Sequence, residues 1–155
     1  MKCTIHTKFR NFQYKYIMRI LPTNEFLLKC KIVSSSLCEF CNMYNETLKH
    51  LFWECQHIRS FWTHFQTFLK SKSIPEKLDF AIVSFGDINK KEEDITKTFL
   101  IILAKYYIFK CKYENTLPDI SSFIIFTRHH ESVERIIATD FGKLDRHIEK
   151  WNNLL

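Results

Sequence analysis

The feature that most constrains this chain is a cluster of three cysteines and one histidine in its first half. The spacing is Cys38-x2-Cys41-x8-His50-x4-Cys55. A cysteine pair separated by two residues places both sulfur atoms on the same side of a tight turn, and a later histidine–cysteine pair supplies two more soft ligands. Four such ligands are typical of a zinc ion held in tetrahedral geometry.

The number of ligands indicates what the metal does. A catalytic zinc ion normally keeps one of its four positions for water and is held by three protein ligands. Here three cysteines and one histidine would fill all four positions, so we predict a structural zinc ion in a CCHC knuckle. Two neighbouring residues, Cys30 and His57, are reserve ligands.

The step from His50 to Cys55 places a condition on the local helix. Five residues of an ideal α-helix turn the chain by ~500°, which would leave these two side chains about 140° apart. If both bind one ion, the helix must therefore start, loosen or end between them.

Disulfide bonds and redox chemistry are less well supported as roles for these cysteines. A disulfide framework needs an oxidising compartment, but the N-terminus has no continuous apolar segment of the kind found in signal peptides. The longest apolar run, Phe99 to Ala104, is far short of the ~18 residues of a membrane span. We therefore expect an intracellular protein, nuclear or cytoplasmic, with no membrane partner. A redox pair lacks its βαβ context, whereas buried free cysteines remain the alternative to a metal site.

Turn-forming residues are scarce in this chain, which has 2 glycines and 3 prolines among 155 residues. β-Sandwiches and barrels need such residues at close intervals, so the composition favours a mainly α fold. We predict a small helical zinc-binding domain over residues 1–72, a linker over 73–94 and a C-terminal helical bundle over 95–155.

Apolar residues at intervals of three and four predict the helices themselves. The predicted helices cover residues 7–21, a short segment capped by Thr23 or Asn24, and a long segment capped by Thr47 that runs through Leu69. Two more cover residues 95–113 and 120–151, the latter with interruptions near Thr139 and Gly142. The helix over 95–113 is apolar on most of its surface and should form the spine of the core. The short apolar run over 80–87 predicts a strand or an extended linker.

Basic residues are dense in the first 31 positions of a chain whose net charge is +6. A basic surface neutralises phosphates and binds nucleic acid without sequence specificity and with a steep salt dependence. Lys8, Lys15 and Arg19 are spaced so as to form one stripe, which we expect opposite the apolar side of the first helix. The candidate nucleic-acid-binding residues are Lys8, Arg10, Lys15, Arg19, Lys29 and Lys31.

Aromatic residues lie between these basic residues in the first helix. Phe12, Tyr14 and Tyr16 would allow the bases of single-stranded nucleic acid to stack on their rings. In the alternative interpretation, Phe12 and Tyr16 belong to the core and the lysines only solvate the other face of the helix.

The stretch CEFCNMYNETLKHLFWECQHIRSFW resembles the zinc-binding region of reverse transcriptases from LINE-type (non-LTR) retrotransposons. The positions that carry the resemblance are Cys38, Cys41, Glu46, Thr47, His50, Leu51, Phe52, Cys55 and Trp62. Further on, ILAKYYIFKCKYENTLP and ESVERIIATDFGKLDRHIEKWNNLL look like the C-terminal tail of the same polyproteins. The resemblance implies that Cys38, Cys41, His50 and Cys55 bind zinc.

The resemblance also implies a role. In that family this region follows the polymerase and is thought to hold template RNA and target DNA for target-primed reverse transcription. The implied partners are therefore RNA or DNA, and a reverse transcriptase polymerase domain. This chain has no Phe/Tyr-x-Asp-Asp motif and no endonuclease constellation, so we predict that it is not an enzyme as it stands. The alternative function is a structural or protein-interaction fragment that packs on a polymerase domain.

Overall fold

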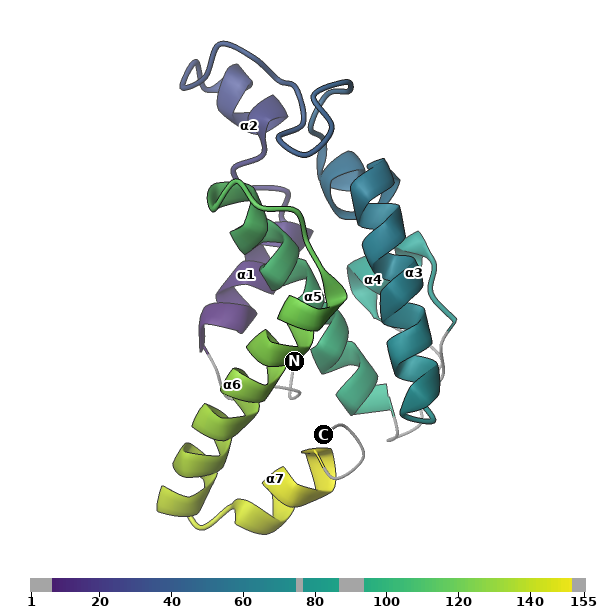
Figure 1. The fold of residues 1–155 in the computed structure, drawn as a ribbon. Helices are drawn as coiled ribbons and strands as arrows, with labels where there is room; N and C mark the ends of the chain where they lie inside the picture. Colours follow the sequence, from purple (N-terminus) through teal and green to yellow (C-terminus); the bar gives the residue numbers. More distant parts are fainter. Residues whose placement is uncertain (1–6, 75–76, 87–93, 152–155) are drawn as a thin grey trace.

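The computed structural model describes residues 7–74, 77–86 and 94–151, which form seven α-helices and one π-helix (Figure 1). The helices are α1 (Thr7–Ile17), α2 (Asn24–Lys29), the π-helix η1 (His50–Glu54), α3 (Gln56–Ser71), α4 (Phe80–Phe85), α5 (Asp94–Tyr113), α6 (Ile120–Asp140) and α7 (Leu144–Trp151). Within these ranges, β-structure is confined to an isolated bridge between Leu37 and Asn45. The prediction of a mainly α fold is confirmed.

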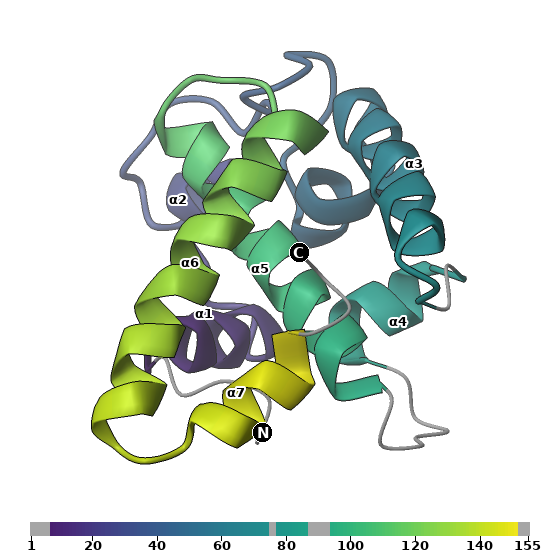
Figure 2. The same cartoon turned by 60° about the horizontal axis from the view of Figure 1, so that its bottom comes forward.

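Helix α5 lies at the centre of the molecule, between α1 and α6 on one side and α3 on the other (Figure 1 and Figure 2). Every residue from Phe99 to Ala104 is at most 3% exposed, and Ile108 and Cys111 continue the buried surface. The prediction that this helix forms the spine of the core is confirmed.

Residues 7–72 and the described residues from 94 onward share one core. The ring centroid of Phe12 in α1 lies 5.4 Å from that of Tyr106 in α5, and Phe61 in α3 lies 5.7 Å from Phe123 in α6. The division into residues 1–72, 73–94 and 95–155 stays a prediction, and the two larger parts are in close contact.

Helix ends in this chain rely on left-handed residues that are mostly not glycine. Helix α1 ends at Ile17, short of the predicted end, because Arg19 takes a left-handed φ of 56°. The amide of Arg19 donates to the carbonyl of Tyr16 (3.1 Å) and that of Ile20 to the carbonyl of Lys15 (3.0 Å), which is a Schellman motif. The same pair of bonds ends α2, α3, α5 and α6, with the left-handed residues Lys31, Ser73, Asn115 and Gly142. The chain thus ends its helices sharply with few glycines.

Residues 80–87 contain a helix, so the predicted strand or extended linker is wrong there. Helix α4 begins after Asp79, whose carboxylate accepts the amide of Ile82 at 2.7 Å, and it ends at Gly86, which has a φ of 82°. So short an apolar run cannot be assigned by periodicity, and the N-cap favours the helix. The rest of the predicted linker includes residues 75–76 and 87–93, which lie outside the described residues.

The remaining helix predictions agree with the structure in outline. Thr23 caps α2, since its hydroxyl accepts the amide of Phe26 at 3.3 Å. The last segment is divided at Gly142, between α6 and α7. Among the helices described, none is both long and apolar enough to cross a membrane.

Candidate metal centre

The structure brings Cys38, Cys41, His50 and Cys55 together, with one potential ligand atom from each residue within 4.8 Å of the others. The Sγ atom of Cys41 lies 3.3 Å from Nε2 of His50. In a tetrahedral site with Zn–S bonds of ~2.3 Å, neighbouring ligand atoms are ~3.5–4 Å apart. Three thiols and one imidazole at these separations fit a zinc ion in both geometry and donor chemistry. With all four positions filled by protein, the ion would hold the chain together and leave no position for water.

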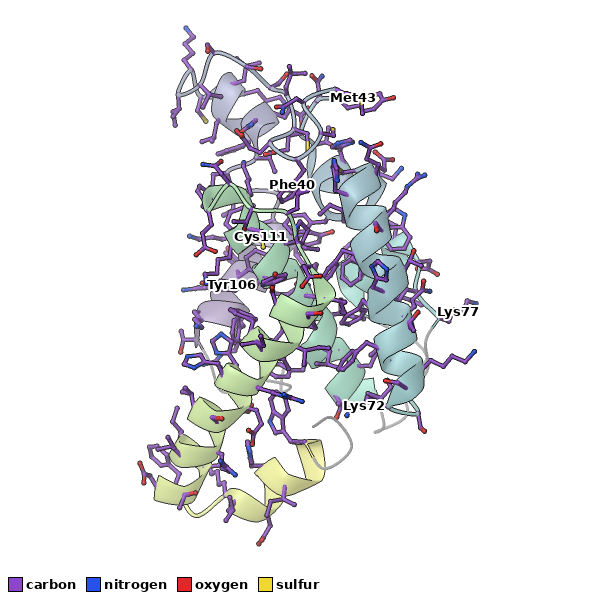
Figure 3. The ribbon with its side chains drawn as sticks, viewed as in Figure 1. Phe40, Met43, Lys72, Lys77, Tyr106 and Cys111 are labelled. Carbon is purple, nitrogen blue, oxygen red and sulfur yellow. The ribbon has the colours of Figure 1, made fainter. Side chains whose placement is uncertain are left out.

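The first two ligands lie on a tight turn between Cys38 and Asn45. The amide of Asn42, which has a left-handed φ of 52°, donates to the carbonyl of Cys38 at 2.8 Å. The amide of Cys38 in turn donates to the carbonyl of Tyr44 at 2.9 Å, which closes the loop. In Figure 3, Phe40 lies on the core side of this knuckle and Met43 at its outer tip. Phe40, which belongs to the buried core, therefore anchors the knuckle to the rest of the fold.

The second two ligands are brought together by the π-helix η1. The amide of Cys55 donates to the carbonyl of His50 at 3.0 Å, so a single turn of five residues separates the two ligands. Cys55 then leaves the helical region with a ψ of 133°, and α3 begins after it. The condition that the helix loosens or ends between His50 and Cys55 is met. The single long helix predicted from Thr47 through Leu69 is wrong, because it is divided at Cys55.

Thr47 caps the start of this segment as predicted, since its hydroxyl accepts the amide of His50 at 3.0 Å.

The surroundings of His50 favour its neutral form. Burial lowers the pKa of His50, although Glu54 and Glu46 act in the opposite direction. A neutral imidazole is the form that coordinates a metal. The local environment of His50 is therefore suited to a ligand.

The two buried thiols have opposite tendencies. A hydrogen bond from the Cys38 thiol lowers the pKa of Cys55, and the backbone amides of His57 and Ile58 lower it further. The same hydrogen bond, together with burial, raises the pKa of Cys38. Because zinc binds thiolates, metal binding at this pair must release a proton.

A buried carboxylate, Glu46, supports the knuckle from behind. It is 0% exposed, and its oxygens accept the backbone amides of Asn24 (2.9 Å) and Glu39 (3.0 Å). It also forms an ion pair with Lys112 of α5, which is likewise buried. In the sequence, only the family resemblance distinguishes Glu46. No sequence pattern points to Lys112 or Asn24, because their contacts with Glu46 are made by the tertiary fold.

The reserve ligands lie outside the cluster. Cys30 is exposed at the end of α2, and the ring of His57 is half-buried, with its Nε2 3.5 Å from the side-chain amide of Gln56. Among the residues that the structure describes, the only group arranged for a metal ion is the set of four.

The six candidate nucleic-acid-binding residues are all exposed; they are Lys8, Arg10, Lys15, Arg19, Lys29 and Lys31. The stripe expected opposite the apolar face borders that face instead. The amine of Lys8 lies 4.9 Å from the ring centroid of Phe9 and 5.6 Å from that of Tyr106. The reason is angular for the two lysines of α1, since Lys15 at i+7 lies ~20° from Lys8 around the helix whereas Phe12 at i+4 is only ~40° away.

Base stacking on Phe12 and Tyr16 is wrong, because the two rings are 4% and 5% exposed. Phe12 packs against Tyr106, and the hydroxyl of Tyr16 lies 2.9 Å from that of Ser84. The interpretation of these two residues as core is confirmed. Tyr14 remains available, since it is 58% exposed.

Comparison with known proteins provides evidence that is independent of this geometry. Residues 1–62 match the family model described as zinc-binding in reverse transcriptase. A search of curated proteins found no significant match. The fold and the site thus define a helical zinc-binding module. Over the matched residues the chain is similar to the zinc-binding region of reverse transcriptases, and its Cys/His cluster fits zinc as the cofactor.

Proposed function

We propose that this zinc-stabilised module binds RNA or DNA through the phosphate backbone, without sequence specificity. The observation that carries the proposal is the exposure of all six basic side chains on α1, α2 and the turns that follow them. Residues 7–31 contain six basic residues and one acidic residue. Their net charge is 6 − 1 = +5, against +6 for the whole chain. Most of the excess positive charge is therefore placed on one contiguous segment, which favours phosphate binding.

The zinc knuckle supports this basic segment. The side-chain amide of Asn24, the first residue of α2, donates to the carbonyl of Leu37 (2.7 Å) and to the carboxylate of Glu39 (2.8 Å). Leu37 and Glu39 flank the first zinc ligand, so the folded knuckle holds the start of α2. Lys29 and Lys31 follow at the other end of that helix. In this proposal the metal orders the surface and does no chemistry.

The family resemblance supports a more specific role. We propose that the module corresponds to the C-terminal part of a LINE-type retrotransposon reverse transcriptase, where it would hold RNA or DNA for target-primed reverse transcription. The match of residues 1–62 to a reverse transcriptase zinc-binding family supports this proposal. The polymerization itself would belong to a separate domain.

A second candidate function is supported by exposed apolar residues beside the basic ones. Tyr14, Ile17, Met18 and Ile20 are 58%, 49%, 54% and 44% exposed, and they are close together around the end of α1. Contiguous apolar surface of this kind is typical of protein interfaces. The alternative is therefore a structural or protein-interaction module that packs on a polymerase domain.

Salt dependence of binding separates the two functions. The affinity of the full chain for single-stranded RNA and DNA should be measured by fluorescence anisotropy over a series of salt concentrations. Binding through phosphates gives a steep decrease of log K with log salt, and removing a phosphate contact reduces the slope by ~1. The double variant Lys15→Gln/Arg19→Gln should reduce the slope by ~2.

The matched control is Arg59→Gln/Lys70→Gln, which removes the same charge from exposed positions on α3. It should leave the slope close to that of the unmodified protein. No binding, or binding that is insensitive to salt, would contradict the nucleic-acid proposal and favour the protein-interaction function. Equal losses in the two double variants would show that only net charge matters.

A further inference from the structure

We infer that Lys112 of α5 is a positioning residue for the zinc site, acting through Glu46, so that the C-terminal half of the chain completes a site whose four ligands all lie before residue 56. The inference concerns zinc binding alone and does not require nucleic-acid binding. It rests on the contacts of two buried charged side chains and on where their other partners lie.

Lys112 has all its acceptors in the first half of the chain. Its amine donates to the carbonyl of Pro22 (3.1 Å), to the side-chain oxygen of Asn24 (3.2 Å) and to the carboxylate of Glu46. An ammonium group has three N–H donors, and here each has an acceptor. With 5% of its surface exposed, Lys112 is held entirely by the loop before α2, by α2 itself and by the segment that follows the knuckle.

Glu46 passes this contact on to both sides of the knuckle. One of its carboxylate oxygens accepts the amide of Glu39, which lies between the first two ligands, Cys38 and Cys41. The backbone amide of Glu46 donates to the carbonyl of Ser36 at 2.7 Å, just before those ligands. Glu46 therefore ties the incoming and outgoing arms of the knuckle together.

The third ligand is reached through the next residue. Thr47 follows Glu46 directly, and its hydroxyl accepts the amide of His50 at 3.0 Å. The position of Glu46 thus affects the placement of three of the four ligands. Groups that orient metal ligands in this way typically change metal affinity 10- to 100-fold when they are removed.

The knuckle and the C-terminal end of α5 meet around a small pocket. The pocket is lined by Glu39 and Phe40 of the knuckle and by Lys112 and Asn115 of the α5 end, with Thr116 and Leu117. Figure 3 shows Phe40 and Cys111, the residue before Lys112, toward the same end of the molecule. Without the Lys112 amine, the fully buried Glu46 carboxylate, which also holds the Glu39 amide, would lose its counter-charge.

The matched control lies on the same helix. Lys105 is also buried, at 1% exposed, but its amine donates to Gln13 of α1 and the carbonyl of Ser84 of α4, both away from the knuckle. Replacing Lys105 removes a buried lysine from α5 without touching Glu46. A loss of zinc affinity that comes only from weakening α5 should appear in both variants.

The first experiment measures zinc affinity of the full chain by competition with a chromophoric chelator. Lys112→Met should weaken zinc binding 10- to 100-fold, whereas Lys105→Met should stay within about twofold of the unmodified protein. Glu46→Gln should weaken binding as well, and Glu46→Gln/Lys112→Met should be no weaker than the worse single variant, because both act through one contact. Unchanged affinity in Lys112→Met, or an equal loss in Lys105→Met, would overturn the inference.

The second experiment uses the unmodified protein and therefore does not depend on a variant that folds. Coupling between sites is reciprocal, so removal of zinc with a chelator should increase amide hydrogen exchange at the C-terminal end of α5, around residues 108–113. Residues 99–104 of the same helix should change less. If zinc removal increased exchange only in the knuckle and left both residues 108–113 and residues 99–104 unchanged, the inference would be overturned independently of the first result.

Discussion

Two lysines on the same face of α5 are both buried, but in opposite electrostatic surroundings. Lys112 meets the carboxylate of Glu46. Among the described residues, Lys105 meets neutral groups: the side-chain oxygen of Gln13 (2.7 Å), the carbonyl of Ser84 (3.5 Å) and the face of Tyr16, 4.1 Å from its centroid. Seven residues apart, the two side chains differ by only ~20° around the helix. The difference between their surroundings therefore comes from the segments that pack on each end of α5. It does not come from the position of the two lysines around the helix.

The two surroundings have different consequences. At the Lys112 end, a charge pair joins the C-terminal half of the chain to the zinc knuckle. At the Lys105 end, burial lowers the pKa of the lysine to about 7, because removing the ammonium from water is costly and no carboxylate of the described part of the chain pairs with it. The first lysine therefore specifies a contact, while the second makes the stability of the core depend on pH.

The largest effect should follow removal of the metal, because this disrupts the zinc knuckle against which the Lys112 end of α5 packs. Chelation or Cys55→Ser should lower the free energy of unfolding by more than ~5 kcal/mol, because a structural zinc ion binds the folded state only. Metal analysis of the purified protein and thermal melting with and without chelator measure this. Cys30→Ser, which changes an exposed thiol outside the cluster, should leave both unchanged. A melting curve that does not respond to chelation would contradict the metal site.

The next effect should come from Lys112→Met in the zinc-loaded protein. Breaking a buried ion pair by removing one partner leaves an uncompensated charge and costs about 3–5 kcal/mol of unfolding free energy. Urea denaturation followed by circular dichroism measures the loss. Lys110→Met is the control, since Lys110 pairs with Glu114 on the surface at 3.3 Å, and exposed pairs contribute less than ~1 kcal/mol. Similar losses in the two variants would remove the distinction between the two sites.

A smaller effect should appear in the pH dependence of stability at the Lys105 end. The folded-state pKa of about 7 lies below the unfolded value of 10.5, so between them the unfolded chain binds more protons and stability rises with pH. The expected gain from pH 7 to pH 9 is roughly 2 kcal/mol. The measurement is the difference in that gain between the unmodified protein and Lys105→Met, which cancels the contributions of the remaining titrating groups. Identical pH profiles would show that Lys105 stays protonated in the fold.

The smallest effect should come from Tyr16→Phe, which makes a small change in the neutral surroundings of Lys105. The variant keeps the ring under the amine but removes the hydroxyl that lies 2.9 Å from Ser84 Oγ. A net loss of ~1 kcal/mol is expected for this one buried hydrogen bond, with zinc affinity unchanged. A change in zinc affinity would mean that the Lys105 end and the knuckle are coupled after all.

The local features of this fold were predictable from the sequence. The ligand spacing from Cys38 to Cys55 and the apolar spine of α5 are short-range patterns, and the structure contains both. The sequence also predicted that the α-helix is interrupted between His50 and Cys55, because two ligands five residues apart cannot share one face of an α-helix. The structure meets this condition with a π-turn. Helix α4 was not, since its apolar run is too short to distinguish helix from strand, and Asp79 can be identified as a cap only once the helix is known.

By itself, therefore, the sequence determined which residues of the knuckle gather around one point and which helix would be most buried. The tertiary structure alone decided that Lys112 of α5 pairs with Glu46 beside the zinc knuckle. The physical reason is distance along the chain. The Lys112–Glu46 pair joins residues 66 positions apart, and periodicity within a single helix carries no information about which other segment will pack on it.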